Sequence, residues 1–416
     1  MKTVILLLSL FCSILFGSDT LAQLISKTPA GSKIQLPKGV FKGPIIIDKP
    51  LVLVGIGKDS IIENDEKGTV ITIKSSNVTI KNIQIQKSGH QRYSFDSGIK
   101  VENSSSIGIE NCTIKDTLFG IYLYNTNHSK ILNNFITSYD EKVVDNRGDG
   151  IRLWQSNDND IVQNRISNSR DLSIYRSNHT LIKNNTIQNS RHAIMINICK
   201  NTYIISNKIF SNYTGIMSMN NKNLSIENNT ITKTHLSTGT GIMLKNGKKI
   251  YITHNSITNN AQAIYIDSST SEIGMQRYIT DNKIAYNNSA FHFHNTIQNN
   301  TIKNNNIIGN LEDVVKDIRE QTRYKNQIEL NYWDRYIGFD KNRDGISDIP
   351  YQVLIYSDKL WQFDHHLKFF YGTPLLSIID FLEKIAPFTE PTILLVDPKP
   401  KTKPIKTAGT TQQNPL

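Results

Sequence analysis

The chain has few cysteines, and beyond its first residues it lacks a long apolar run. It holds three cysteines, of which Cys12 lies in the N-terminal apolar segment, leaving Cys112 and Cys199 without CxxC spacing. That number excludes a disulfide-dense scaffold, and it allows one disulfide without requiring it. A membrane-spanning helix needs about 20 apolar residues. No such run follows the N-terminus, which argues against an integral membrane protein.

The N-terminus has the pattern of a secretory signal. Lys2 precedes the apolar run 4–16, and small residues at Gly17, Ser18 and Ala22 follow it. A charged start, a short apolar core and small residues are typical of a cleaved signal peptide. The sequence therefore predicts a signal peptide over residues 1–22 and an exported, periplasmic protein.

The positive charge has no clustered arrangement. The formal net charge is +11, but no Arg/Lys-rich helix and no nucleic-acid-binding motif accompany it. We therefore expect no nucleic-acid partner. Part of the charge lies in residues 399–416, where Lys alternates with Pro, and this composition predicts a flexible basic tail.

Self-similarity is the strongest positive signal. Segments such as SKILNNFI, HTLIKNNTI and NLSIENNTI recur, most often 22 residues apart. Such a period predicts a solenoid in which each coil packs on the next. The isoleucines that end successive copies are Ile114, Ile136, Ile166, Ile187, Ile209, Ile231, Ile257, Ile284 and Ile302.

Polar residues recur at fixed places before that isoleucine. The residue three before it is often Asn or Asp, as in Asn133, Asn184 and Asp281, and these types tolerate the left-handed conformation of a sharp bend. If the coils stack, the asparagines that lie two residues before each anchor isoleucine are about 4.8 Å apart, within hydrogen-bonding reach of one another. This predicted asparagine ladder consists of Asn134, Asn164, Asn185, Asn207, Asn229, Asn255, Asn282 and Asn300, with Cys112 in the same position upstream.

A second strand follows in each copy, beginning with a small residue, as in Gly120-Ile-Tyr-Leu and Gly241-Ile-Met-Leu. The sequence thus predicts an all-β, right-handed parallel β-helix of about ten coils in residues 23–310, with residues 34–53 as its N-terminal cap. An antiparallel β-sandwich is disfavoured because hairpin turn pairs are absent and the asparagine keeps a constant phase.

The repeat fades after Gly309, and residues 311–366 are predicted to form a C-terminal cap that begins with a short helix over residues 311–324. This region contains GFDKNRDGISDIPY. Alternate oxygen-bearing residues followed by Gly345 match the first half of a calcium loop, but Tyr351 replaces the twelfth-position Glu, which excludes a complete EF-hand. Calcium binding and a plain Asx-rich turn both remain open for Asp340, Asn342, Asp344, Ile346 and Asp348.

Residues 367–398 are predicted to contain an amphipathic helix from Thr373 to Ala386. Thr373 suits the N-cap, Pro374 suits the first helical position and Pro387 ends the helix. Because a β-helix core is already closed, this segment needs another surface. It either folds back on the solenoid or docks on a partner.

The asparagine-ladder coils, together with NYWD and GFDKNRDGISDIPY, resemble the NosD family of periplasmic maturation proteins over nearly the whole chain after the signal. Sugar-active β-helix proteins share the coil repeat, and archaeal surface β-helix proteins share the second pattern. The resemblance implies a non-enzymatic accessory protein that works with an ABC-type ATPase and permease. Such proteins support the delivery of copper, with sulfur as a second candidate, to the copper–sulfur centre of nitrous oxide reductase.

The same resemblance implies transient contact with a copper chaperone and with the reductase, and attachment to the membrane only through the permease, on which residues 367–398 would dock.

Copper(I) prefers soft sulfur ligands and accepts imidazole. The outward middle position of the second strand holds methionine in successive copies, and Met219 and the histidines share that face. An apolar outward surface covered by a loop or partner is the competing explanation. The predicted copper ligands are Met195, Met217, Met219, Met243, His292 and His294.

The alternative function is a carbohydrate-binding protein or a polysaccharide lyase or hydrolase. The acidic and basic residues Asp145, Arg147, Asp149, Arg152 and Asp171 could form a catalytic patch beside the long coil. Such chemistry needs a general base and a charge-neutralising cation.

Overall fold

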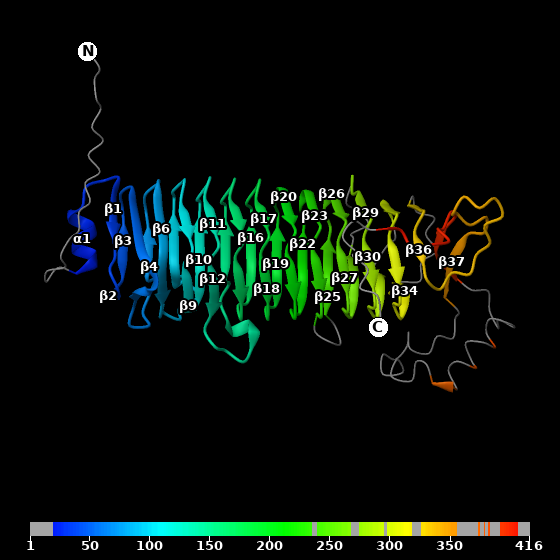
Figure 1. The fold of residues 1–416 in the computed structure, drawn as a ribbon, viewed down its shortest axis with the longest axis horizontal. Helices are drawn as coiled ribbons and strands as arrows, with labels where there is room; N and C mark the ends of the chain where they lie inside the picture. Colours follow the sequence, from blue (N-terminus) through cyan, green and yellow to red (C-terminus); the bar gives the residue numbers. More distant parts are fainter. Residues whose placement is uncertain are drawn as a thin grey trace, which may run out of the picture. The chain divides into compact units, whose positions relative to one another are not determined.

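A computed structural model describes residues 20–234, 239–267, 274–294, 298–317, 326–355 and 392–406, with isolated positions between 373 and 382. It divides into two compact units after Tyr213. Each unit is a parallel β-helix, which confirms the predicted fold (Figure 1). Most of the predicted signal peptide and of the predicted helix 373–386 falls outside the described residues.

Every complete coil contributes one strand to a single-strand face and strands to a paired-strand face. In the first unit the single-strand face contains β3 (Ile45–Ile47), β5 (Ile71–Ile73), β7 (Ser97–Glu102), β10 (Phe119–Tyr124), β13 (Ile151–Trp154), β16 (Asp171–Tyr175) and β19 (His192–Asn197). Its paired-strand face contains β1 (Ser32–Gln35), β2 (Gly39–Lys42), β4 (Leu51–Glu63), β6 (Val78–Gln86), β8 (Gly108–Glu110), β9 (Thr113–Thr117), β11 (Lys130–Leu132), β12 (Phe135–Ser138), β14 (Asp160–Val162), β15 (Arg165–Ser167), β17 (Leu181–Lys183), β18 (Thr186–Gln188), β20 (Lys200–Ile205) and β21 (Lys208–Phe210).

The second unit repeats this plan. Its single-strand face contains β22 (Thr214–Met219), β25 (Thr240–Lys245), β28 (Gln262–Asp267), β31 (Ser289–Phe293) and β34 (Glu312–Lys316). Its paired-strand face contains β23 (Lys222–Glu227), β24 (Thr230–Thr232), β26 (Lys248–Thr253), β27 (Ser256–Thr258), β29 (Arg277–Thr280), β30 (Lys283–Ala285), β32 (Asn300–Lys303), β33 (Asn306–Ile308), β35 (Gln327–Glu329) and β36 (Tyr332–Trp333). Among the described residues the single-strand faces hold twelve strands in all, against the predicted ten coils.

Helix α1 (Leu21–Lys27) lies at the N-terminal end of the first unit. Leu21, Leu24 and Ile25 are buried, and the helix packs on β3. It covers the first coil, and the segment 34–53 that was predicted to be the cap forms most of this coil and the start of the next. An amphipathic helix suits this place because its apolar stripe covers the open core while it offers no strand edge.

The bend predicted three residues before each anchor is confirmed. Asn111, Asn133, Asn184, Asn228 and Asp281 all have left-handed φ angles, between 53° and 59°. This conformation turns the chain between the two strands of a pair, so that the isoleucines on both sides point inward. Ile131 and Ile136, for example, are both buried.

The ladder is confirmed in each unit, with one correction. Asn134 donates from its backbone N and its Nδ2 to Asn164 Oδ1, at 2.9 and 3.0 Å. In the second unit Asn282 donates in the same way to Asn305, not to Asn300. Asn300 instead donates to Asn326 in a separate position. The predicted phase was wrong there because the copy ends at Ile307, which pairs with Ile284, and not at Ile302.

The β-helix continues past the predicted boundary at residue 310. Glu312–Lys316 is the strand β34 and not part of a helix, and its Val314 faces Phe291 of the preceding coil. Residues 318–324 of that predicted helix lie outside the described residues. The last paired strand ends at Trp333, whose side chain is buried.

The chain then returns to the end of the second unit. Strand β37 (Tyr351–Ile355) pairs antiparallel with β38 (Thr392–Asp397). Beyond β38, Ile405 and Asn306 exchange hydrogen bonds of 2.8 Å in both directions. Residues 392–405 thus fold back on the solenoid, and the tail predicted to be flexible from residue 399 is fixed as far as Ile405.

Candidate metal site

Met217 and Met243 are neighbours on the outward side of the single-strand face of the second unit. They are register partners on β22 and β25, and Met243 is in turn the partner of Tyr265 on β28. Adjacent strands lie about 4.8 Å apart, so the two thioethers can reach one point. Both side chains are half-buried, whereas their chain neighbours Ile216 and Ile242 point into the core.

Met219 lies on the same face, two residues beyond Met217, and faces Lys245. Met195 belongs to the first unit, where it is the register partner of Ser173. Its Sδ accepts a hydrogen bond of 3.2 Å from the Tyr175 hydroxyl. The structure therefore brings Met217, Met219 and Met243 to one face of one unit and leaves Met195 in the other unit.

His292 and His294 share one carboxylate that the sequence analysis did not identify. A ring nitrogen of each lies 2.7 Å from an oxygen of Asp317, Nε2 for His292 and Nδ1 for His294. Asp317 comes directly after β34, so a strand predicted there would have placed it beside the histidines. Partial burial raises the pKa of the Asp317 carboxyl, but hydrogen bonds to His294 and His292 outweigh burial and lower that pKa below its ordinary value.

Tyr265 separates the sulfur group from the imidazole group. It is the register partner of His292, and the two rings meet edge to face with centroids 4.9 Å apart. Over the described ranges, no group of three or more His, Cys, Asp or Glu side chains is placed to hold a metal ion.

The cysteines are not available as ligands. Cys112 and Cys199 are both buried, and neither forms a disulfide. Burial raises the pKa of Cys112 to about 12 and that of Cys199 to about 11, so the thiolate that binds metals is not formed. Cys112 takes a ladder position, as predicted, since its backbone N donates to Asn134 Oδ1.

The Asp-rich loop follows the last coil of the second unit. Its side-chain oxygens accept hydrogen bonds from the loop's own backbone: Asp340 from Asp344 N and Gly345 N, Asn342 from Asp344 N, Asp344 from Ile346 N, and Asp348 from Lys341 N. Tyr351, in the twelfth position, donates to Asp313 instead of approaching the loop. The arrangement is a set of Asx turns, and calcium binding stays a prediction.

The patch considered for polysaccharide chemistry forms a buried ion network. Asp149 is fully buried and accepts hydrogen bonds from Arg152 at 3.0 Å and Arg170 at 2.9 Å. Asp171 is bonded to Arg191 and His192. Burial raises the pKa of Asp171, but these partners outweigh burial and lower it to about 2. Both carboxylates are held by cations in this arrangement, which suits neither a general acid nor a free base.

Arg147 belongs to the loop that joins this network. Its Nε donates to Glu141 O and its Nη1 to Asn189 O. Asp145 pairs with Arg191 at 2.9 Å. These contacts fix the long loop on the coil, which is the role that the geometry supports for the patch.

Comparisons with known proteins agree with this architecture. Residues 137–338 match the family model described as periplasmic copper-binding protein (NosD), and residues 54–166 match the right-handed β-helix region. The chain is 24% identical to a probable ABC transporter binding protein NosD of Pseudomonas aeruginosa, covering 85% of this chain and 84% of that protein. It is 21% identical to the protein of the same name from Stutzerimonas stutzeri, covering 85% and 83%.

Solved structures share the fold at low identity. The Dettilon tailspike protein matches 81% of this chain and 67% of its own with a TM-score of 0.58 and 13% identity. The catalytic domain of a GH87 alpha-1,3-glucanase in complex with tetrasaccharides matches 77% and 68% with a TM-score of 0.55 and 13% identity. Within the described ranges, no helix has the length and apolarity needed to cross a membrane. The resemblance predicted from the sequence is confirmed: the chain is a right-handed parallel β-helix similar to the NosD proteins over most of its length.

Proposed function

We propose that this chain is a periplasmic copper-binding accessory protein, not an enzyme, that works with an ABC-type ATPase and permease. In this role it would support the delivery of copper, with sulfur as a second candidate, to the copper–sulfur centre of nitrous oxide reductase. The matched family is described as periplasmic and copper-binding, and the relatives are named ABC transporter binding proteins.

The in-register pair Met217 and Met243 is the observation that carries the copper part of this proposal. Two thioethers on adjacent strands, with a third at Met219, offer copper(I) the soft donors that it prefers. His292 and His294 would supply imidazole at the next outward position beyond Tyr265. Copper is here the cargo, bound on an outward face from which a partner protein could take it.

Anaerobic copper(I) competition against a chromophoric chelator tests this site. Leucine resembles methionine in volume and shape but lacks sulfur. We expect the triple variant M217L/M219L/M243L to bind copper(I) at least tenfold more weakly than the wild type. M275L, at a buried methionine outside the strands of this face, is the matched control with unchanged affinity. Full affinity in the triple variant would rule the methionine site out.

The transporter part needs a variant that leaves the β-helix intact. Truncation is unsuitable because residues 392–405 fold back on the last coils. Leu375→Asp with Leu382→Asp would instead disrupt the apolar stripe predicted for residues 373–386. We expect this variant to lose co-purification with the permease. Retention of the complex would show that the docking surface lies elsewhere.

Transient contacts with a copper chaperone and with the reductase would be tested separately by cross-linking.

Calcium at the Asp-rich loop is a separate proposal. Asp340, Asn342, Asp344 and Asp348 supply oxygens at alternate or near-alternate positions, and Ile346 supplies a carbonyl. Millimolar calcium should raise the Tm of the wild type and not that of D340N/D344N. An equal Tm with calcium and with chelator would reject calcium binding at this loop.

A further inference from the structure

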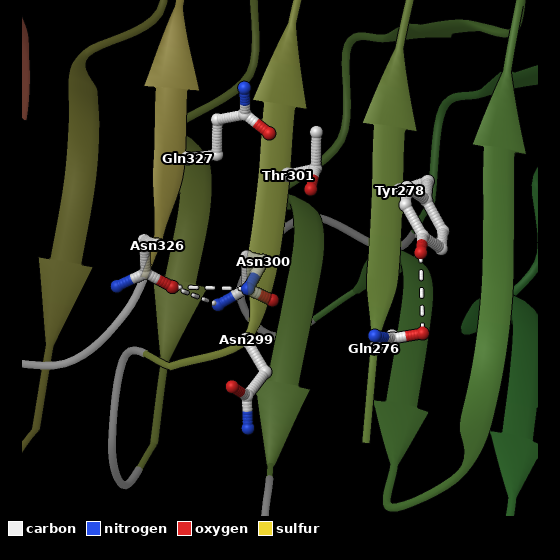
Figure 2. Close-up of a pocket in the computed structure, with 7 residues that line it drawn as sticks. All are labelled: Gln276, Tyr278, Asn299, Asn300, Thr301, Asn326 and Gln327. Atoms are coloured by element: carbon white, nitrogen blue, oxygen red, sulfur yellow. Dashed lines mark hydrogen bonds between the residues drawn. The ribbon is translucent and has the colours of Figure 1, made fainter. Parts of the chain in front are cut away.

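A groove lies on the outward side of the paired-strand face of the second unit (Figure 2). Its volume is about 270 Å³. It is lined by Gln276, Tyr278, Asn299, Asn300, Thr301, Asn326 and Gln327, all of them neutral and polar.

A stacked pair of tyrosines lies at one side of the groove. Tyr278 stacks on Tyr251 of the preceding strand, with ring centroids 4.9 Å apart and planes 8° apart. In register beyond Tyr278 come Thr301 and Gln327. Tyr251 is 39% exposed but does not line the groove. Because the two stacked rings cover each other's facing sides, a ligand in the groove can stack only on the other side of Tyr278.

The groove also carries hydrogen-bonding groups that the fold does not use. Asn300 and Asn326 are bonded to each other inside the wall, whereas the Asn299 amide and the Thr301 hydroxyl make no side-chain hydrogen bond to any described residue. Gln276 accepts from the Tyr278 hydroxyl at 3.2 Å, and its amide NH₂ donates to no described residue.

Two sets of charged side chains lie near the groove among the described residues. Behind the lining, the buried Arg277 donates to Asn300 Oδ1 at 3.2 Å. On the outward side, Lys303 and Glu329 form an ion pair with each other, and Gln327 donates to Glu329 at 2.9 Å. An anionic polymer would therefore meet no unpaired cation in the lining. An apolar peptide would find no apolar floor, since the lining offers amides, hydroxyls and one ring.

We infer that this groove binds a neutral carbohydrate chain, with Tyr278, supported from behind by Tyr251, as the stacking ring and Asn299, Thr301 and Gln276 as partners for sugar hydroxyls. A sugar ring has an apolar face that packs on an aromatic ring, and hydroxyls that both donate and accept. Primary amides match them because each offers donors and an acceptor. The rise of about 4.8 Å per coil is close to the length of one sugar unit, so successive units can follow successive coils.

Affinity gel electrophoresis of the full chain tests this inference independently of copper. The probes are a soluble β-glucan and pullulan as neutral polysaccharides, and polygalacturonate as the anionic comparison. We expect one neutral glucan to retard the wild type, and Tyr278→Ala to weaken the interaction at least fivefold. Tyr203→Ala, which removes an exposed tyrosine of the first unit, is the control that retains binding.

Asn299→Gly is the second variant, because Asn299 has a left-handed φ of 55° that glycine adopts freely. This variant removes the side-chain amide without disturbing the strand. It therefore tests carbohydrate binding even if circular dichroism shows that Tyr278→Ala is misfolded. Loss of binding in Asn299→Gly supports the site. Retardation by polygalacturonate alone, by no polysaccharide at all, or equally in Asn299→Gly and the wild type would overturn it.

Discussion

Asp397 closes the asparagine ladder of the second unit by accepting both amide donors of Asn331. Its Oδ2 lies 3.1 Å from the backbone N and 3.0 Å from Nδ2 of Asn331. Every earlier ladder residue donates to the amide oxygen of the next coil, but Asn331 has no following coil. A carboxylate suits this place because it accepts hydrogen bonds without adding a donor that would need a partner.

Asp397→Ala should destabilise the protein by about 3 kcal/mol, because it leaves buried donors of Asn331 and of Trp333 Nε1 without an acceptor. Asp397→Asn keeps one acceptor oxygen and should cost about half as much. Urea unfolding measures both, with Asp59→Ala, a change at an exposed residue, as the control near zero. A loss in Asp397→Ala no larger than in the control would contradict the capping role.

Asn255→Ala interrupts the ladder in its middle. Asn255 Oδ1 accepts from the N and Nδ2 of Asn229, and its own Nδ2 donates to Ile226 O at 2.8 Å. We expect a loss of about 3 kcal/mol in the free energy of unfolding, since two buried donors lose their acceptor. Asn288→Ala, at an exposed position, should change the stability by less than about 0.5 kcal/mol. Similar values for both variants would mean that the ladder contributes little.

Asp171 should make the free energy of unfolding depend on pH in the range below the ordinary pKa of an aspartate. Its pKa is lowered from 3.8 to about 2 in the folded protein. A depressed folded-state pKa gives stability that is complete above pH 4 and is lost as the pH falls towards 2. The loss should reach about 2 kcal/mol. Asp171→Asn should be less stable at pH 7 and show a smaller decline over this range; a decline equal to that of the wild type would assign the effect to other carboxylates.

Cys112 and Cys199 should resist alkylation in the folded protein. Both thiols are buried, and burial raises the pKa of each, so the reactive thiolate is scarce. Iodoacetamide at pH 8 should label neither residue within an hour and both in denaturant, as read by mass spectrometry of peptides. Rapid labelling of one cysteine in the native protein would show that its coil opens locally.

The isoleucine anchors and their flanking asparagines were sufficient to predict the coil, the left-handed bend and most of the ladder. These features are readable because each coil repeats the same contacts about 22 residues later. The predicted ladder was wrong at the last copy, where Ile302 resembles an anchor but Ile307 is the residue paired with Ile284. The same alternation placed Met217 and Met243 together on the outward side.

The sequence by itself determined the β-helix, since local periodicity fixes which side chains enter the core and which stack from coil to coil. Only the tertiary structure decided which side chains meet where the repeat ends and on the outward faces of the coils. Asp397 reaches Asn331 from 66 residues away, and Asp317, at the end of the adjacent strand, meets His292 and His294. Asp149 lies beneath Arg152 and Arg170 rather than in a catalytic cleft. Asp397 comes from outside the repeating contacts, so no period in the sequence could locate it. Asp317 and Arg170 lie one coil from their partners, but the repeat alone did not show which side chains would meet there.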